Sequence, residues 1–181
     1  MSFKHSKGVT SMFEYNVRPA APHDAKQLSY LRQLVDKETD YLDREEGEHN
    51  LSAEQFLEII TKDHKEKNRY CVVAELNQEI VGFARLQGSD LIRFQHHVEF
   101  GVAILKSHWR KQIGTRLLQD CLSYADQQRI AKVTLRVQEA NTKAIHLYKK
   151  YGFLIEGTLK NDKKMPDGSL HHTVLMARFL T

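Results

Sequence analysis

Residues 98–118 read VEFGVAILKSHWRKQIGTRLL, which predicts a strand, a short basic turn and the start of a helix. Side chains alternate along a strand, so Glu99 shares one face with the small residues Gly101 and Ala103, while larger apolar residues take the other face. Small neighbours leave room for a ligand beside this carboxylate. The helix start adds unpaired N–H groups and the positive end of the helix dipole, which together bind phosphate groups. This stretch therefore predicts a ligand site with a phosphate subsite.

Both features also have a purely structural explanation. An ordinary connection between a strand and a helix, with Gly114 at a close packing contact, would produce the same pattern. A carboxylate within an apolar strand is unfavourable unless it is paired, solvated or in a cleft. An ion pair between Glu99 and a basic neighbour is thus the alternative to a functional role.

Residues 141–153, NTKAIHLYKKYGF, predict a short helix that begins after Asn141, a favourable N-cap residue. Ala144 and Tyr148 follow three and seven positions later, which places all three residues on one face of the helix. The phenol is thereby directed past a small side chain. A core aromatic with a satisfied hydroxyl would show the same spacing, so the pattern alone leaves the role of Tyr148 open.

The remaining sequence predicts an α+β domain with a single mixed sheet. Helices come first, then an antiparallel set of strands, then alternating strands and helices. Asn77-Gln78 is typical of a hairpin turn, and Ser52 with Gln55 fits a capping box. The predicted strands are 14–18, 70–76, 79–86, 97–105, 132–137, 153–159 and 173–179, and the predicted helices are one that begins at Pro22, one that begins at Ser52, 112–127 and 142–151.

Length and composition indicate one ordinary globular domain. The chain has 181 residues, of which 41% are hydrophobic and 28% charged. We expect a flexible tail over 1–13 and a single domain over 14–181. No apolar run approaches the ~18 residues of a membrane span and no secretory signal is recognised, so a cytoplasmic protein without a membrane partner is expected. Cys71 and Cys121 lie in apolar contexts and are expected to be buried free thiols.

Several common catalytic patterns are absent from the sequence. It has no glycine-rich dinucleotide turn, no P-loop ending in Gly-Lys-Ser/Thr and no Gly-x-Ser-x-Gly elbow. The adjacent pairs His96-His97 and His171-His172 would point to opposite faces of a strand, so neither pair converges easily on one ion. We therefore expect no metal.

Together, the two stretches resemble the GNAT superfamily of N-acetyltransferases, and the resemblance covers 14–179. In that family the pattern Asn-x-x-Ala-x-x-Leu-Tyr-x-x-x-Gly-Phe is diagnostic, and 17–20 and 155–157 are similar to family segments as well. The resemblance implies one mixed, mostly antiparallel sheet of six to seven strands with about four flanking helices. It also implies that acetyl-CoA lies in a V-shaped split between the fourth and fifth strands. The pattern is complete here as Asn141, Ala144, Leu147, Tyr148, Gly152 and Phe153.

The phosphate-binding turn departs from the family pattern Gln/Arg-x-x-Gly-x-Gly/Ala. With Gly114 aligned to the last glycine, Trp109 and Gln112 occupy the first two defined positions, and the Cβ of Gln112 narrows the conformations open to the turn. The N–H groups at the helix start remain whatever the side chain. The residues expected to contact acetyl-CoA are Val102, Ile104, Trp109, Arg110, Lys111, Gln112, Ile113, Gly114, Thr115, Asn141 and Ala144.

Transfer of an acetyl group to an amine requires a base, a donor to the thioester oxygen and an acid for the leaving thiolate. A lysine-like amine has a pKa of ~10.4, so a base must remove its proton at neutral pH, and Glu99 is the candidate. Backbone N–H groups around Val102 would hold the oxygen. By resemblance, Tyr148 protonates the departing thiolate and Asn141 helps to order the pantetheine arm. We expect direct transfer in a ternary complex, without a covalent enzyme intermediate.

Charge distribution suggests a class of acceptor. The net charge is +4, yet 36–48 is strongly acidic. In this family the first two helices and their loop form one wall of the acceptor site. An acidic wall would favour a cationic acceptor, such as a polyamine, an aminoglycoside-like amine or a peptide N-terminus, and the alternative is a solvated charge run unrelated to substrate. The acidic residues are Asp36, Glu38, Asp40, Asp43, Glu45, Glu46 and Glu48.

Two other classes of function stay open. A catalytically silent CoA-sensing module would keep the cofactor cleft but lack a base, and Glu99 with Tyr148 argues against it. A nucleic-acid-binding protein would account for the positive net charge, but it predicts a basic stripe with interleaved aromatic residues rather than an acidic segment. We therefore expect a small-molecule or peptide amine as partner, no nucleic acid, and either a monomer or a homodimer.

Overall fold

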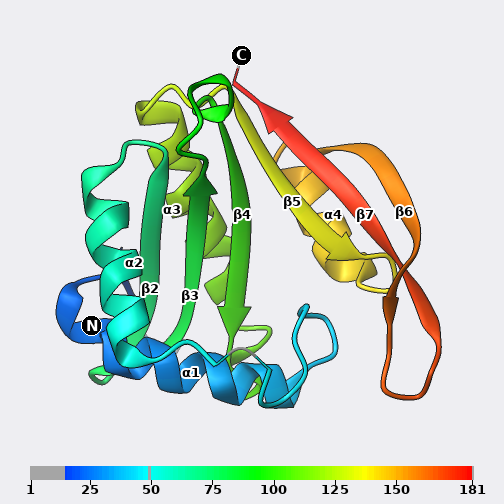
Figure 1. Ribbon diagram of the computed structural model, residues 1–181, viewed down its shortest axis with the longest axis horizontal. Coiled ribbons are helices and arrows are strands. Elements are labelled where there is room, and N and C mark those ends of the chain that lie inside the picture. Colours follow the sequence, from blue (N-terminus) through cyan, green and yellow to red (C-terminus); the bar gives the residue numbers. More distant parts are fainter. Residues whose placement is uncertain (1–14, 49, 181) are drawn as a thin grey trace, which may run out of the picture.

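The computed structural model describes residues 15–48 and 50–180, so the tail expected over 1–13 lies outside the described residues. Seven strands form one sheet in the order β1-β2-β3-β4-β5-β7-β6 (Figure 1). The strands are β1 (Asn16–Pro19), β2 (Arg69–Leu76), β3 (Glu79–Gly88), β4 (His97–Ile104), β5 (Lys132–Gln138), β6 (Leu154–Lys164) and β7 (Leu170–Phe179). The helices are α1 (Ala25–Glu38), α2 (Ala53–Lys65), α3 (Ile113–Gln127) and α4 (Thr142–Lys150), with short 3-10 turns η1 (Pro22–Asp24), η2 (Ile92–Phe94) and η3 (Lys106–His108).

Strand directions agree with the predicted mixed sheet. Each neighbouring pair of strands is antiparallel except β4 and β5, which run parallel. A parallel pair needs a long crossover, and here α3 makes the crossover between β4 and β5. Within the described residues, one mostly antiparallel sheet with four α-helices is the architecture that the sequence predicts.

Local sequence signals place several element ends. The Ser52 hydroxyl accepts the N–H of Gln55 at 3.2 Å while the Gln55 side chain accepts the N–H of Ser52 at 2.8 Å, which is the predicted capping box of α2. Asn77 and Gln78 both have positive φ, 51° and 68°, and form the two-residue turn of the β2–β3 hairpin. Pro22 begins the turn η1 rather than α1 itself.

Helices cover both faces of the sheet (Figure 1). The apolar stripe of α3, which includes Leu117, Leu118 and Cys121, is fully buried in one core cluster. Cys71 belongs to a second cluster together with residues of α1 and α2. Both cysteines are free and buried, as predicted, and burial raises the pKa of the Cys71 thiol to about 12. Among the helices described, none is long and apolar enough to cross a membrane.

The last hairpin is longer than the sequence predicts. β6 continues through Lys164 and β7 begins at Leu170, so the two strands form an extended arm at one edge of the sheet (Figure 1). Pairing is interrupted by a register shift between Leu159 and Lys163, where Asn161 has a φ of 53°. The added segment is mostly charged, and it therefore lacks the alternation of apolar and polar residues that predicts a strand.

Candidate active site

Strands β4 and β5 form a fork. Their parallel register runs from His97 opposite Lys132 to Glu99 opposite Thr134 and ends there. Beyond this point the two strands diverge (Figure 1). The V-shaped split that the resemblance implies is thus present, and Glu99 lies at its vertex.

One edge of β4 is open toward the fork. Leu105 donates its N–H to the carbonyl of Val81 on β3 at 3.0 Å, and hydrogen bonds alternate in direction along a strand. The N–H groups of Val102 and Ile104 are therefore directed away from β3, into the fork. The indole N–H of Trp109 donates to the Ile104 carbonyl at 2.9 Å, which fixes the turn against the end of the strand.

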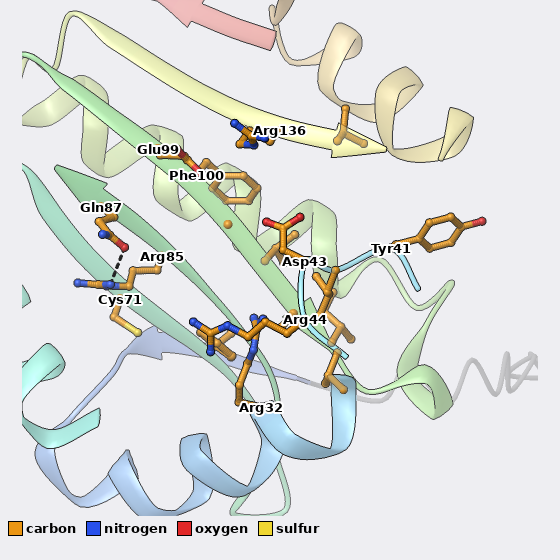
Figure 2. A pocket seen from close by; sticks show the side chains of 18 of the residues that line it. Arg32, Tyr41, Asp43, Arg44, Cys71, Arg85, Gln87, Glu99, Phe100 and Arg136 are labelled. Atoms are coloured by element: carbon orange, nitrogen blue, oxygen red, sulfur yellow. Dashed lines mark hydrogen bonds between the residues drawn. The ribbon is translucent and has the colours of Figure 1, made fainter. Parts of the chain in front are cut away.

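A cavity of about 800 Å³ begins in the fork and continues between the sheet, α1 and α2 (Figure 2). The face of β4 predicted to be open lines this cavity, and a Cβ added to Gly101 would meet nothing within 4 Å. In the described part of the chain, no three His, Cys, Asp or Glu side chains are arranged to hold a metal ion. The predicted site residues that line the cavity are Glu99, Val102, Ile104, Trp109, Asn141 and Tyr148.

Glu99 is exposed to the cavity and has no ion-pair partner among the described residues. The nearby basic side chains of β5 pair with β6 instead, Lys132 with Glu156 and Arg136 with Asp162, each at 2.8 Å. The ion pair that the sequence offered as the alternative role of Glu99 is therefore not formed. A carboxylate without a basic partner at the vertex of the fork can accept a proton.

Tyr148 is the most buried polar group that lines the fork. It is 8% exposed, and its ring contacts those of Phe100 and Phe153, with centroids 6.1 and 5.8 Å away. Burial raises the pKa of the phenol to about 12, and no described residue hydrogen-bonds its hydroxyl. Tyr148 is thus a protonated phenol at neutral pH. The Asn141 side chain accepts the N–H of Ala144 at 3.2 Å and is the predicted N-cap of α4.

The turn before α3 holds two non-glycine residues in the left-handed region. Arg110 and Gln112 have φ values of 62° and 61°, and Gln112 is the N-cap residue of α3 without a side-chain cap. A Cβ on Gly114 would lie 3.2 Å from Cδ1 of Ile104, so this glycine permits the close approach of α3 to β4. The family glycine that Gln112 replaces would adopt its backbone conformation without strain.

Seven predicted cofactor residues do not line the cavity. The Ile113 side chain is 2% exposed and belongs to the core, so only its backbone can face a ligand. The others lie in the turn before α3, at the start of α3 or in the first turn of α4. These residues are Arg110, Lys111, Gln112, Ile113, Gly114, Thr115 and Ala144.

The acidic wall, one of the two interpretations of 36–48, does not form at the cavity. Of the seven acidic residues in 36–48, only Asp43 lines the cavity, and it pairs with Lys163 of β6 at 2.5 Å. Asp36 is buried and pairs with Arg32 at 3.1 Å. Glu46 forms an ion pair with Lys37, so three of the seven acidic residues of the segment are paired with basic side chains.

Arginines dominate the charged lining of the cavity, which sequence reasoning missed. They come from α1, the loop after it, β3 and β5, and no linear pattern joins them. The available signal was Arg85, a charged residue within the apolar strand sequence IVGFARL. The arginines are Arg32, Arg44, Arg85 and Arg136.

Residues 30–153, which include the fork and both decisive stretches, match the model of a family described as acetyltransferase (GNAT) family. The chain belongs to the GNAT family. A solved GNAT-family acetyltransferase from Streptococcus pneumoniae superposes with a TM-score of 0.89 at 28% identity, covering 92% of this chain and 100% of that one.

Two characterised relatives match parts of this GNAT chain. The L-amino acid N-acetyltransferase AaaT of Escherichia coli (strain K12) is 32% identical over 91 residues, 49% of this chain and 56% of the relative. The spermidine N(1)-acetyltransferase of Vibrio cholerae is 29% identical over 110 residues, 60% of this chain and 62% of the relative. Each match spans less than two thirds of the relative.

We predict that Gln112→Gly stabilises the fold. Glycine adopts a positive φ without the steric cost of a Cβ, so the free energy of unfolding should rise by about 1 kcal/mol. Urea denaturation measures the change. Gln128→Gly is the matched control, because Gln128 has a φ of −81° and glycine should destabilise there. An equal loss of stability in both variants would show that the left-handed conformation of Gln112 is not strained.

Proposed function

We propose that this GNAT chain transfers the acetyl group of acetyl-CoA to a primary amine by direct attack in a ternary complex. The observation that carries the proposal is the presence of Glu99, without an ion-pair partner among the described residues, and the buried phenol of Tyr148 in one cavity at the β4–β5 fork. Family membership supports acetyl transfer, and the two relatives are named for the acetylation of different amines. The cytoplasmic location and a homodimer stay predictions.

The open edge of β4 fits the arm of an acyl carrier. Because β5 has diverged, the N–H groups of Val102 and Ile104 are available to an extended chain with amide groups, as a strand partner would use them. The start of α3 directs N–H groups at the place where a pyrophosphate would lie. Acetyl-CoA would supply the activated thioester, and Trp109, fixed on Ile104, would flank it.

Glu99 is the proposed base, which accepts a proton from the amine. A primary amine is mostly protonated at neutral pH and must lose one proton before its nitrogen can form the new amide bond. Glu99 faces the cavity and can accept this proton directly or through water. Its place at the vertex puts the base beside the open edge of β4, where the thioester oxygen would meet backbone N–H groups.

Tyr148 is the proposed acid, which donates a proton to the leaving thiolate. When the carbon–sulfur bond breaks, the departing thiolate takes the proton of the phenol, which is protonated because burial holds its pKa at about 12. The second proton, lost by the attacking nitrogen as the amide forms, restores the phenol. The packing of Phe100 and Phe153 fixes the ring. Asn141, which caps α4, also lines the cavity and would orient the carrier arm.

Acetyl-CoA should stabilise the folded chain. A ligand at about 100 times its dissociation constant adds ~2.7 kcal/mol, which for this chain length raises the melting temperature by roughly 5 to 10 °C. Thermal unfolding with millimolar acetyl-CoA tests this, with free adenosine as the control ligand. An unchanged melting temperature would overturn the cofactor assignment. A shift without turnover of any amine would instead favour the CoA-sensing module.

Tyr148→Phe should lower turnover by roughly 100-fold, because it removes the proton donor and keeps the ring. The thermal shift with acetyl-CoA should persist. Tyr151→Phe is the matched control, since Tyr151 ends the same helix but does not line the cavity. Release of the CoA thiol measures turnover. If Tyr148→Phe turns over like the control, the phenol is a packing residue.

Glu99→Gln should slow the reaction most at neutral pH. At high pH the amine is already deprotonated, so the difference from the unmodified chain should shrink as pH rises toward 10. A pH–rate profile of both chains tests this, and Glu58→Gln on the exposed face of α2 is the control. A rate defect that is constant across pH would exclude Glu99 as the base.

A further inference from the structure

The face of β4 that lines the cavity carries a histidine beside Glu99. His97 lies two positions before Glu99 in the strand, so both side chains leave it on one face, about 6 to 7 Å apart along the strand. Both residues line the cavity. His96, the other member of the adjacent pair in the sequence, is exposed and does not line it. The fold thus directs one histidine of this pair to the proposed base.

The strand register identifies the side chains that surround Glu99. Gln87 lies opposite Glu99 on β3, and Thr134 lies opposite it on β5. Gly101 and His97 are its two neighbours on the same face of β4. Amide and hydroxyl side chains do not exchange their ionisation state near neutral pH, and glycine has no side chain. Among these neighbours, His97 alone can take up a proton at neutral pH.

A hydrogen bond fixes where the proton of the neutral His97 ring lies. Its Nε2 is 2.7 Å from Oγ1 of Thr134, and this hydroxyl donates its single proton to the Val98 carbonyl at 3.3 Å. In the bond with His97 the hydroxyl therefore accepts, and Nε2 carries the ring proton. No described residue hydrogen-bonds Nδ1, which keeps its lone pair. The ring can thus gain a proton at Nδ1 without losing its contact with Thr134.

The surroundings of His97 keep the ring neutral before turnover. Burial lowers the pKa of His97, Lys132 of β5 and the adjacent His96 lower it further, and Glu156 of β6 raises it. Lys132 and Glu156 pair with each other at 2.8 Å. Glu99 is the other charged residue on this face of β4. A neutral imidazole therefore stands beside a carboxylate that has no ion-pair partner among the described residues.

We propose that His97 receives, through one bridging water molecule, the proton that Glu99 takes from the amine. This inference rests on the proposed acetyl transfer and adds a second proton acceptor to it. The proton leaves the ammonium nitrogen for the carboxylate, which passes it through the water to Nδ1. Glu99 is then a carboxylate again and His97 is an imidazolium. The imidazolium releases its proton to solvent before the next turnover, which restores the starting state.

The relay has a chemical reason. A proton acceptor is most effective when its pKa lies near the operating pH. The ordinary pKa of an imidazole, ~6.5, is a closer match to neutral pH than that of a glutamic acid, ~4.3. A carboxylate beside an imidazolium also favours the charged form of the ring. A water molecule with hydrogen bonds of about 2.8 Å to each side can join two side chains at this spacing.

Two-bond proton–nitrogen NMR spectra of the full chain test the tautomer and the coupling without any acceptor. His97→Gln identifies the His97 signals by their loss. At neutral pH the spectra should show a protonated Nε2 and a bare Nδ1. Glu99→Gln should lower the pKa of His97, because it removes the negative charge that favours the imidazolium. A protonated Nδ1, or a His97 titration that Glu99→Gln leaves unchanged, would overturn the inference.

Release of the CoA thiol tests the relay in turnover, with L-methionine, L-phenylalanine, spermidine and leucyl-glycine as acceptors. With the acceptor of this set that reacts fastest, His97→Gln should lower kcat about 10- to 100-fold at pH 7. The loss should shrink as pH rises toward 10, because the amine is then already deprotonated. His96→Gln is the matched control and should keep its rate within about twofold. A loss in His97→Gln that is constant across pH would show that the ring only supports the structure.

The double variant His97→Gln/Glu99→Gln distinguishes one relay from two independent groups. If both side chains handle the same proton, the double variant should be no more than about threefold slower than the slower single variant. Losses that multiply would show that the two side chains act independently, and the relay would be wrong. The ratio of rates at pH 10 and pH 7 within one variant does not depend on the fraction that folds.

The outcomes separate this inference from the proposed function. Unchanged turnover in His97→Gln, together with a pH-dependent loss in Glu99→Gln, would overturn the relay and leave acetyl transfer intact. If acetyl-CoA stabilises the chain but none of the four acceptors releases thiol, the proposed activity fails, and the relay fails with it because no amine proton is moved.

Discussion

The parallel hydrogen bonding of β4 and β5 ends at Glu99 and Thr134, and the geometry of the site depends on this ending. Before it, the two strands are held in register. After it, β4 keeps its partner β3 on one edge while the N–H groups of Val102 and Ile104 have no strand partner on the other. This open edge is where we propose that the amide-bearing arm of the acyl carrier pairs with β4, as a neighbouring strand would.

Burial gives Glu99 and Tyr148, the two proposed proton carriers, opposite properties. Glu99 is exposed to the cavity, and the basic residues that could have paired with it, Lys132 and Arg136, are paired with β6 instead. Tyr148 is enclosed by Phe100 and Phe153, so its phenol is protonated across the neutral range. Sheet order produces this contrast, because β7 and β6 follow β5 and bring acidic side chains to its basic ones.

The charged side chains that line the cavity differ from those of the neighbouring acidic segment 36–48. Acidic residues dominate 36–48, and three of them, Asp36, Asp43 and Glu46, pair with basic residues of α1 and of the β6–β7 arm. Arg32 and Arg44 line the cavity beside the apolar side chains of Val35, Leu51 and Phe56. A segment that is acidic in sequence thus borders a cavity whose charged lining is mostly arginine, because most of the acidic side chains of the segment do not line it.

The sequence by itself determined the order of elements, the capping box of α2, the β2–β3 turn and the two family stretches, since these depend on periodicity and on neighbours within a few residues. It also placed Glu99, Tyr148 and Asn141 in the site, because each belongs to one of those stretches. Only the tertiary structure decided three other features. These are the ion-pair partners of the acidic segment, the length of the β6–β7 arm and the arginines that line the cavity. Arg32 and Arg85 are 53 positions apart in the sequence and line the same cavity only because α1 packs on β3. No local pattern could therefore show that they share a cavity.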